Sequence, residues 1–330
     1  MKKNIIKIVA FLGILSIILL KINDVLSFKY TDGITQMDHF YKLDDDTVDV
    51  LVLGSSHAFV NVNPTILYNE YGIASYNLCA SMQPTWNTYY YLKEALKYQK
   101  PDLIVMDVYR LTETFTYSKE SKMIKSTYGM RFNGNKYQAI YQSLENPNVG
   151  ETLLYMMEFP SYHGRYVEVL QGNLQGEAVV GEGYKGAHPV TEVAAMERPD
   201  NSGVTEKLSI EPKTFLYFEK ILALADEEEI PVLLINAPYI MGKEDKMIFN
   251  SLEEYLSTQD TYDNVAYVDY NKFYDELGLD FSIDFADPEH LNTSGMKKFN
   301  KTLGAYIKAN YELEDRRGNP DFASYELNEE

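Results

Sequence analysis

A single run of residues, 47–57, decides the fold, and its sequence is TVDVLVLGSSH. Residues 50–53 are all valine or leucine, and a glycine and two serines follow them. An apolar run that ends in a glycine turn predicts a buried strand of a parallel sheet, because both faces of such a strand are covered. Four further segments have a similar apolar character, at residues 74–78, 103–108, 230–236 and 265–269.

Segments with helical character separate these strands, at residues 85–98, 213–225 and 293–311. Strands that alternate with helices predict an α/β fold. We therefore expect a three-layer α/β/α arrangement around a mainly parallel, five-stranded, flavodoxin-like sheet. The sheet is expected to be complete only after the chain returns at residue 212.

Residues 111–211 interrupt this alternation, and we interpret them as a long insertion. We expect the insertion to pack over the carboxyl edge of the sheet, where open α/β sheets bind ligands. The α/β domain is expected to span residues 31–320, with an acidic tail at 321–330. Residues 312–330 are acidic and poor in large apolar side chains, which predicts a solvated extension.

The composition describes an acidic globular protein. The chain has 330 residues, of which 45% are hydrophobic, and a formal net charge of −19. These proportions exclude a disordered or collagen-like chain, and the negative charge excludes general binding to nucleic acid. The single cysteine, Cys79, rules out an intrachain disulfide but does not fix the compartment, since many secreted proteins lack disulfides.

The first 30 residues have the pattern of a membrane anchor. Residues 8–20 carry no charge, three lysines precede them, and no A-x-A-like cleavage site follows. We therefore expect an uncleaved signal anchor at residues 1–30, with the N-terminus in the cytoplasm and a catalytic domain outside the cell. A cleaved signal peptide and a buried helix of a soluble protein are the alternatives.

The first candidate for a reactive side chain is Ser56, which follows the first strand directly. A serine at a strand-to-helix turn stands above the sheet edge, where backbone N–H groups of the next helix can face a developing oxyanion. The alternative is an ordinary turn in which Ser55 or Ser56 caps the helix.

The second is the loop at residues 284–292, which reads DFADPEHLN. Its Asp287 precedes His290 by three residues, so the carboxylate can accept the Nδ1 proton and present Nε2 outward, as in a serine triad. One alternative is a surface turn that is followed by a helix cap. Another is metal ligation by Asp287 and His290 together with His57, although the spacing is not that of a zinc site.

Ser56 and His290 are both expected at carboxyl ends of strands, so an open parallel sheet brings them together. In this combination the chain resembles the SGNH (GDSL-like) hydrolase superfamily, in particular its extracytoplasmic branch in alginate acetylation and teichoic-acid D-alanylation. The resemblance covers about residues 47–110 and 212–310. It implies that Ser56 is the nucleophile, His290 the base and Asp287 its partner.

Three positions depart from the superfamily pattern, and the first is residues 77–82, NLCASM, where the usual glycine is missing and the Ala80 or Ser81 amide could serve instead. Ser55 stands where the G-D-S form has aspartate, and residues 106–110, MDVYR, lack the asparagine that donates to the oxyanion. An ionised Asp107 would repel an oxyanion, so we expect Tyr109, Arg110 or the Ser81 amide to replace that donor. The loss of one donor costs about 10²–10³ in rate, which favours slow transfer chemistry over fast hydrolysis. For Arg110, the alternative is an ion pair with Asp107.

Within the insertion, residues 162–166 read YHGRY. His163 and Arg165, with the tyrosines beside them, are candidates for an acceptor-sugar groove, and a packed loop with a solvated arginine is the alternative. Cys79 is expected to be a small core residue and not a nucleophile.

Two functional hypotheses follow. The first is a membrane-anchored serine acyltransferase or esterase that acts on O-acyl groups, acetyl above all, of cell-surface or secreted polysaccharide. It needs no cofactor or metal, and it implies a multi-span membrane O-acyltransferase as a partner. The second is a non-catalytic binding or assembly component on the same fold. Geometry separates them, because the first requires Ser56 Oγ within hydrogen-bond reach of His290 Nε2.

Overall fold

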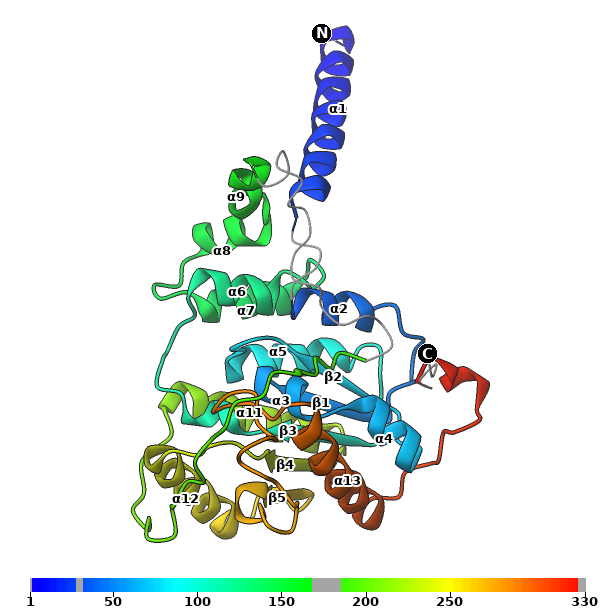
Figure 1. The fold of residues 1–330 in the computed structure, drawn as a ribbon. Coiled ribbons are helices and arrows are strands. Elements are labelled where there is room, and N and C mark those ends of the chain that lie inside the picture. The colour runs from blue at the N-terminus through cyan, green and yellow to red at the C-terminus, as the bar shows by residue number, and fades with distance from the viewer. Residues whose placement is uncertain (1, 28–31, 168–184, 326–330) are drawn as a thin grey trace.

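A five-stranded sheet, with all strands parallel and in the order β2-β1-β3-β4-β5, lies at the centre of the computed structural model (Figure 1). The structure describes residues 2–27, 32–167 and 185–325. The α/β class and the parallel five-stranded sheet are thereby confirmed. The strands are β1 (Val50–Gly54), β2 (Ser75–Cys79), β3 (Leu103–Asp107), β4 (Val232–Asn236) and β5 (Val265–Asp269).

Each face of the sheet has its own apolar cluster, because side chains alternate along a strand. Leu51 and Leu53 of β1 join the cluster on one face, and Val50 and Val52 join the other. The first cluster is completed by α5 (Thr85–Ala95), α11 (Pro212–Glu227) and α12 (Lys243–Thr258). The second is completed by α3 (Ser56–Asn61), α4 (Pro64–Tyr71) and α13 (Thr293–Asn310), with the turn η4 (Tyr270–Lys272).

The N-terminal helix α1 (Lys2–Leu26) extends away from this body (Figure 1). Its segment Lys3–Ile22 has a mean hydropathy of 2.6, and no part of its most apolar window is buried in the protein. The helix is therefore long and apolar enough to cross a membrane. The short helix α2 (Ile34–Phe40) follows, and Ile34 packs near Leu26.

The described part of the stretch between β3 and β4 is helical up to residue 165. After the turn η1 (Tyr109–Thr112), it forms α6 (Glu120–Thr127), α7 (Gly134–Ser143), α8 (Val149–Met156), α9 (Phe159–Tyr162) and η2 (His163–Arg165). Here α7 lies against α5, where Trp86 Nε1 donates to Ser143 Oγ at 3.1 Å. Helix α7 therefore extends the packing beside α5, whereas α6 lies near the loop after β2, since Lys125 and the Ser81 amide both bond to Asp32.

The second part of that stretch reaches the carboxyl edge. Residues 185–211 contain no helix or strand before α11 begins, and they follow the loops at that edge. The amide of His188 donates to the Phe59 carbonyl at 2.8 Å, and the amide of Ala194 donates to the Phe285 carbonyl at 2.9 Å. The extended segment thus braces α3 and the loop at 284–292.

The prediction of a solvated C-terminal tail is wrong for the residues that the structure describes. In η5 (Pro320–Tyr325), Phe322 and Tyr325 are buried, and Tyr325 stacks on Tyr68 with ring centroids 5.3 Å apart. Arg316 donates to both carboxylate oxygens of Asp49, at 2.9 and 2.8 Å. The burial of Phe322 and Tyr325 and the ion pair of Arg316 with the buried Asp49 hold this segment against the body, despite its acidic composition. Residues 326–330 lie outside the described residues.

A glycine is required where β1 turns into α3. Gly54 has φ of +152°, a region that L side chains rarely adopt, and a Cβ there would lie 2.8 Å from the Ala58 Cβ and 3.2 Å from the Asp107 Cβ. The turn can place Ser56 at the sheet edge only because this position carries no side chain.

We therefore expect Gly54→Ala to lower the free energy of unfolding by about 2 kcal/mol or more, through backbone strain and these contacts. The control is Gly134→Ala, since a Cβ at Gly134 meets no atom within 4 Å. Thermal unfolding of the detergent-solubilised chain should show a lower melting temperature for Gly54→Ala alone. Equal melting temperatures for the two variants would contradict this account of the turn.

Candidate active site

The turn after β1 positions Ser56 as the first residue of α3. Ser55 occupies the N-cap position in an extended conformation, and its side chain makes no capping hydrogen bond. Ser56 is only partly buried, whereas Ser55 is 1% exposed. Ser56 is therefore the accessible serine of the pair at the carboxyl edge of the sheet.

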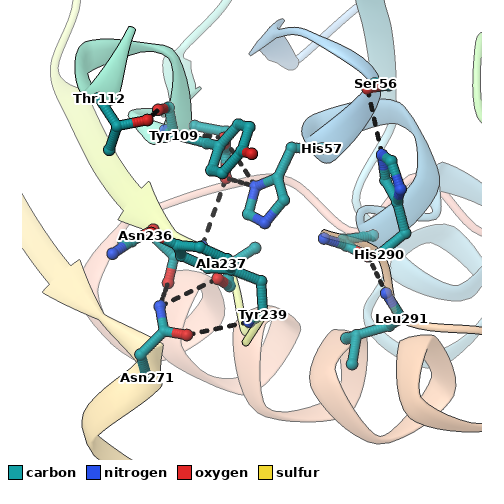
Figure 2. A network of polar contacts seen from close by, with 12 residues as sticks. Ser56, His57, Tyr109, Thr112, Asn236, Ala237, Tyr239, Asn271, His290 and Leu291 are labelled. Atoms are coloured by element: carbon teal, nitrogen blue, oxygen red, sulfur yellow. Dashed lines mark hydrogen bonds and ion pairs between the residues drawn. The ribbon is translucent and has the colours of Figure 1, made fainter. Parts of the chain in front are cut away.

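The loop that precedes α13 brings a histidine to this serine. Figure 2 shows Ser56 and His290 facing one another, with His290 Nε2 3.1 Å from Ser56 Oγ. On the other side of the ring, His290 Nδ1 lies 3.0 and 2.9 Å from the two carboxylate oxygens of Asp287. The carboxylate favours the tautomer with a proton on Nδ1, which leaves Nε2 free to accept a proton from the serine.

Buried polar contacts hold this loop in place. Asn61, at the end of α3, accepts a hydrogen bond from the amide of Leu291, the residue after His290, at 3.0 Å. Asp284 is fully buried, accepts from the Asp280 amide at 2.7 Å and pairs with Lys298 at 2.5 Å. We missed Asn61 and Asp284 in the sequence, where neither stands in a recognisable motif.

The close approach of α13 to the loop also depends on a glycine. A Cβ on Gly295 would lie 2.3 Å from the Asp284 carbonyl oxygen. Asn292 caps the helix by accepting from the Ser294 and Gly295 amides at 3.0 and 3.2 Å, as its place in the sequence indicated. The His290 loop is thus fixed at both of its ends.

A second histidine–aspartate pair lies beside the first, in the protein interior. His57 Nδ1 is 2.9 Å from each carboxylate oxygen of Asp107, and both side chains are buried. Asp107 also accepts from the Tyr109 amide at 3.1 Å and from the Ala237 amide at 3.3 Å. The pair therefore ties α3 to the ends of β3 and β4, at the level of the nucleophile.

Two aromatic rings enclose this buried pair. Tyr109 stacks on His57 with ring centroids 4.5 Å apart, and Tyr239 meets the same ring edge-on at 5.3 Å (Figure 2). The His290 ring is 6.4 Å away. Sequence reasoning considered His57 as a metal ligand, and Asp107 as a repulsive charge or as an ion-pair partner of Arg110. The available sequence signal was position, since His57 follows β1 and Asp107 ends β3, and both strands end at the same edge of the sheet.

Two of the three residues that we expected to replace the oxyanion donor are engaged elsewhere. The Ser81 amide donates to Asp32 Oδ1 at 2.8 Å, so it does not point freely to the site. Arg110 Nη1 pairs with Glu113 and not with Asp107, which corrects the alternative of an Asp107–Arg110 ion pair, while its buried Nε and Nη2 have no hydrogen-bond partner among the described residues. Its guanidinium carbon lies 5.0 Å from the centre of the Phe115 ring.

Tyr109 is the remaining candidate donor. Its side chain is only partly buried and lies over His57 (Figure 2). Burial raises the pKa of the Tyr109 hydroxyl, and the nearby Glu289 and Asp245 carboxylates raise it further. The phenol therefore keeps its proton at neutral pH and can donate a hydrogen bond.

The structure places the proposed acceptor-sugar residues elsewhere. Arg165 Nη1 donates to the Leu26 carbonyl oxygen at 2.6 Å, at the end of α1. His163 belongs to the same turn, η2, which lies next to α9 and the foot of α1, away from the carboxyl edge (Figure 1). The prediction that His163 and Arg165 belong to an acceptor-sugar groove stays a prediction, and the contact of Arg165 with Leu26 places that turn at the end of α1.

A cavity of 690 Å³ does lie at the carboxyl ends of β4 and β5. Arg198, Asp269, Asn271 and Tyr274 are among the side chains that line it. Asn271 accepts from the amide of Tyr239, the residue whose ring contacts His57. Tyr239 therefore lies between the cavity lining and the buried His57–Asp107 pair.

Neither a metal nor a thiol mechanism finds support in the described part of the chain. Within residues 2–27, 32–167 and 185–325, no group of three or more His, Cys, Asp or Glu side chains could hold a metal ion. Cys79 is buried, and burial raises the pKa of its thiol well above the usual value, so the reactive thiolate is disfavoured.

Comparisons with known proteins assign no family. No family model matches the chain, and a search of curated proteins gives no significant match. The functional argument therefore depends on the geometry of the site.

The buried His57–Asp107 pair should contribute strongly to stability. We expect Asp107→Ala to lower the free energy of unfolding by about 3 kcal/mol or more, because it leaves buried N–H donors without an acceptor. Asp102→Ala, an exposed carboxylate just before the same strand, is the matched control. Chemical denaturation should separate the two variants. A chemical denaturation curve for Asp107→Ala that matches that of Asp102→Ala would contradict this role.

For Arg110, the contacts with Glu113 and Phe115 predict a structural effect. Arg110→Gln should cost about 1–3 kcal/mol of stability through the lost charge-assisted bond and ring contact. Turnover per folded molecule should stay near normal. A variant with unchanged melting temperature and a reduced kcat would instead show that Arg110 acts on the reacting group.

Proposed function

We propose that this protein is a membrane-anchored, extracytoplasmic serine acyltransferase or esterase that acts on O-acyl groups, acetyl above all, of cell-surface or secreted polysaccharide. The observation that carries the proposal is the chain of hydrogen bonds from Ser56 through His290 to Asp287. These side chains are contributed by two loops at the same sheet edge, in the order and at the distances that nucleophilic catalysis needs.

In the proposed reaction, Ser56 Oγ attacks the carbonyl carbon of the acyl donor, and His290 Nε2 takes the hydroxyl proton. The tetrahedral intermediate then expels the donor's leaving oxygen, which receives that proton from His290. An acyl-serine remains. An acceptor hydroxyl, from sugar or water, gives its proton to His290 and attacks the ester, which restores Ser56. Asp287 holds the ring and stabilises its positive charge throughout.

The oxyanion of each intermediate requires donors, and we assign the side-chain donor to the Tyr109 hydroxyl. The engagement of Ser81 with Asp32 and of Arg110 with Glu113 supports this choice. A neutral phenol in place of an amide fits an enzyme that works slowly on a tethered polymer. The cavity at β4 and β5 is the place where a saccharide acceptor would bind, since it offers polar side chains and a tyrosine ring.

The cellular setting is part of the same proposal. The apolar helix α1 supports a single-pass anchor, and the lysines before it favour a cytoplasmic N-terminus with the body outside. The resemblance to extracytoplasmic SGNH proteins suggests a three-layer domain with an insertion at residues 111–211. It also suggests a multi-span membrane O-acyltransferase as the source of acyl groups.

One observation favours a second function, that of a non-catalytic binding component. Two candidate oxyanion donors, the Ser81 amide and Arg110, bond to other protein groups. A protein of this kind would bind polysaccharide without forming an acyl-serine, so covalent chemistry at Ser56 separates the two functions.

The test uses the full chain in lipid nanodiscs with an activated acetyl ester, with and without acetyl-accepting oligosaccharides. We expect intact-mass and peptide mass spectrometry to find an acetyl group on Ser56. Ser56→Ala should lose the adduct and about 10³-fold or more in turnover. Ser55→Ala is the matched control, since this neighbour is buried and makes no capping bond. A Ser56 that stays unmodified while the protein binds oligosaccharide would favour the non-catalytic function.

The triad members should behave as one unit. His290→Ala and Asp287→Asn should each reduce turnover strongly, and the double variant Ser56→Ala/His290→Ala should be little worse than either single change. The melting temperature of each variant checks that the fold is retained. If His290→Ala keeps full activity, another group is the base and the proposed mechanism fails.

A further inference from the structure

Helix α8 presents an apolar face that nothing in the described protein covers. Its residues Val149, Leu153 and Leu154, with Met157 just after the helix, are 48–65% exposed. Leu153, Leu154 and Met157 follow Val149 by four, five and eight residues, which places all four on one side of the helix. The remaining side, with Thr152, Tyr155 and Met156, packs into the protein, where Met156 joins a small core with Ile140 and Leu144. We call the four exposed side chains the α8 apolar face.

The segment after α8 lies at the end of the apolar helix. Tyr162 of α9 packs with Leu26 in one cluster, and Arg165 donates to the Leu26 carbonyl oxygen at 2.6 Å. Helix α9 contacts α1, and α8 packs against α9 (Figure 1). Two more apolar side chains, Tyr166 and Val167, are 57% and 44% exposed next to this contact.

The depth of this contact relative to a bilayer follows from helix geometry. The apolar segment of α1 ends at Ile22, four residues before Leu26. At 1.5 Å per residue, Leu26 lies about 6 Å beyond the end of the span. The headgroup region on each side of a bilayer is about 5–7 Å thick. The contact between Arg165 and α1 therefore lies at the depth of the headgroups.

The charges near the contact do not oppose a lipid surface. Glu158, between α8 and α9, pairs with Lys136 and accepts from the Tyr162 hydroxyl at 2.7 Å, so its charge is compensated within the protein. Tyrosines at this level resemble the aromatic residues that are enriched at membrane interfaces.

We propose that the α8 apolar face, with Tyr166 and Val167, lies in the headgroup region of the bilayer leaflet on the body's side of the membrane. This inference rests on the proposed membrane anchoring by α1 and goes beyond the proposed chemistry. The body is then held at the membrane by two contacts, one spanning and one interfacial, and it cannot swing freely about the end of α1. A fixed orientation keeps the carboxyl edge of the sheet at a set distance from the lipid surface.

The experiment measures the quenching of tryptophan fluorescence by brominated phosphatidylcholine in nanodiscs that hold one full-length chain. The native Trp86 is fully buried and supplies a constant background. Leu154→Trp reports on the α8 apolar face, and Leu216→Trp is the matched control, because these leucines are 54% and 48% exposed on helices. Ile14→Trp, within the apolar segment of α1, reports on the anchor itself.

We expect about twofold or greater quenching for Leu154→Trp, strongest with bromines near the headgroup end of the acyl chains, and none for Leu216→Trp. Ile14→Trp should be quenched most by bromines deep in the bilayer. If Ile14→Trp is quenched and Leu154→Trp is not, the interfacial contact is overturned while the anchor stands. If Ile14→Trp is not quenched, the anchor and the inference both fail, without bearing on the chemistry of Ser56.

Two further measurements distinguish lipid from protein as the occupant of the α8 apolar face, and a lost contact from a misfolded variant. A blue-shifted Leu154→Trp emission without quenching would mean that protein, a second copy or another partner, covers the face, and it would overturn the proposal. Met157→Trp is the second reporter in case Leu154→Trp does not fold, and it should be quenched like Leu154→Trp. An unquenched Met157→Trp in a folded chain would overturn the proposal as well.

Discussion

The hydrogen-bonded pair of His57 and Asp107 is the contact on which the geometry of the site depends. It joins the first turn of α3 to the end of β3, and the Ala237 amide extends the connection to the end of β4. An unpaired carboxylate or imidazole would be costly in a fully buried position, so each partner restricts the other. The direction in which α3 leaves the sheet, and with it the position of Ser56, follows from this restraint.

The same restraint explains why the site departs from the superfamily pattern. An acid at the end of β3 would repel an oxyanion if it faced the substrate, but Asp107 faces His57 and three N–H donors surround its carboxylate. Under the proposed function, the residue where the superfamily has an oxyanion asparagine thus supports Ser56 instead. The proposed donor is then a neighbour, Tyr109, whose amide also bonds to Asp107.

Elements that depend on local pattern could be predicted from the sequence, and those that depend on long-range partners could not. Apolar runs located the strands to within about two residues, and the shared carboxyl edge predicted that His290 meets Ser56. The partner of His57 was not predictable, because strand order and side-chain direction together determine it. The contact between Trp86 and Ser143, which fixes α7 beside α5, could not be predicted for the same reason. The burial of Tyr325 was not predicted, because the acidic composition of residues 312–330 was given more weight than a single aromatic residue.

The choice between sugar and water as acceptor depends on what surrounds the acyl-serine, and here fold and membrane contact act together. Among the described residues, the helices α6–α9 pack beside α5 and at the foot of α1, and residues 185–211 brace the loops and leave Ser56 partly exposed. For the proposed transferase, a high local concentration of acceptor favours sugar over water, and a body held against the membrane gains this concentration when its polymer is tethered to the same surface.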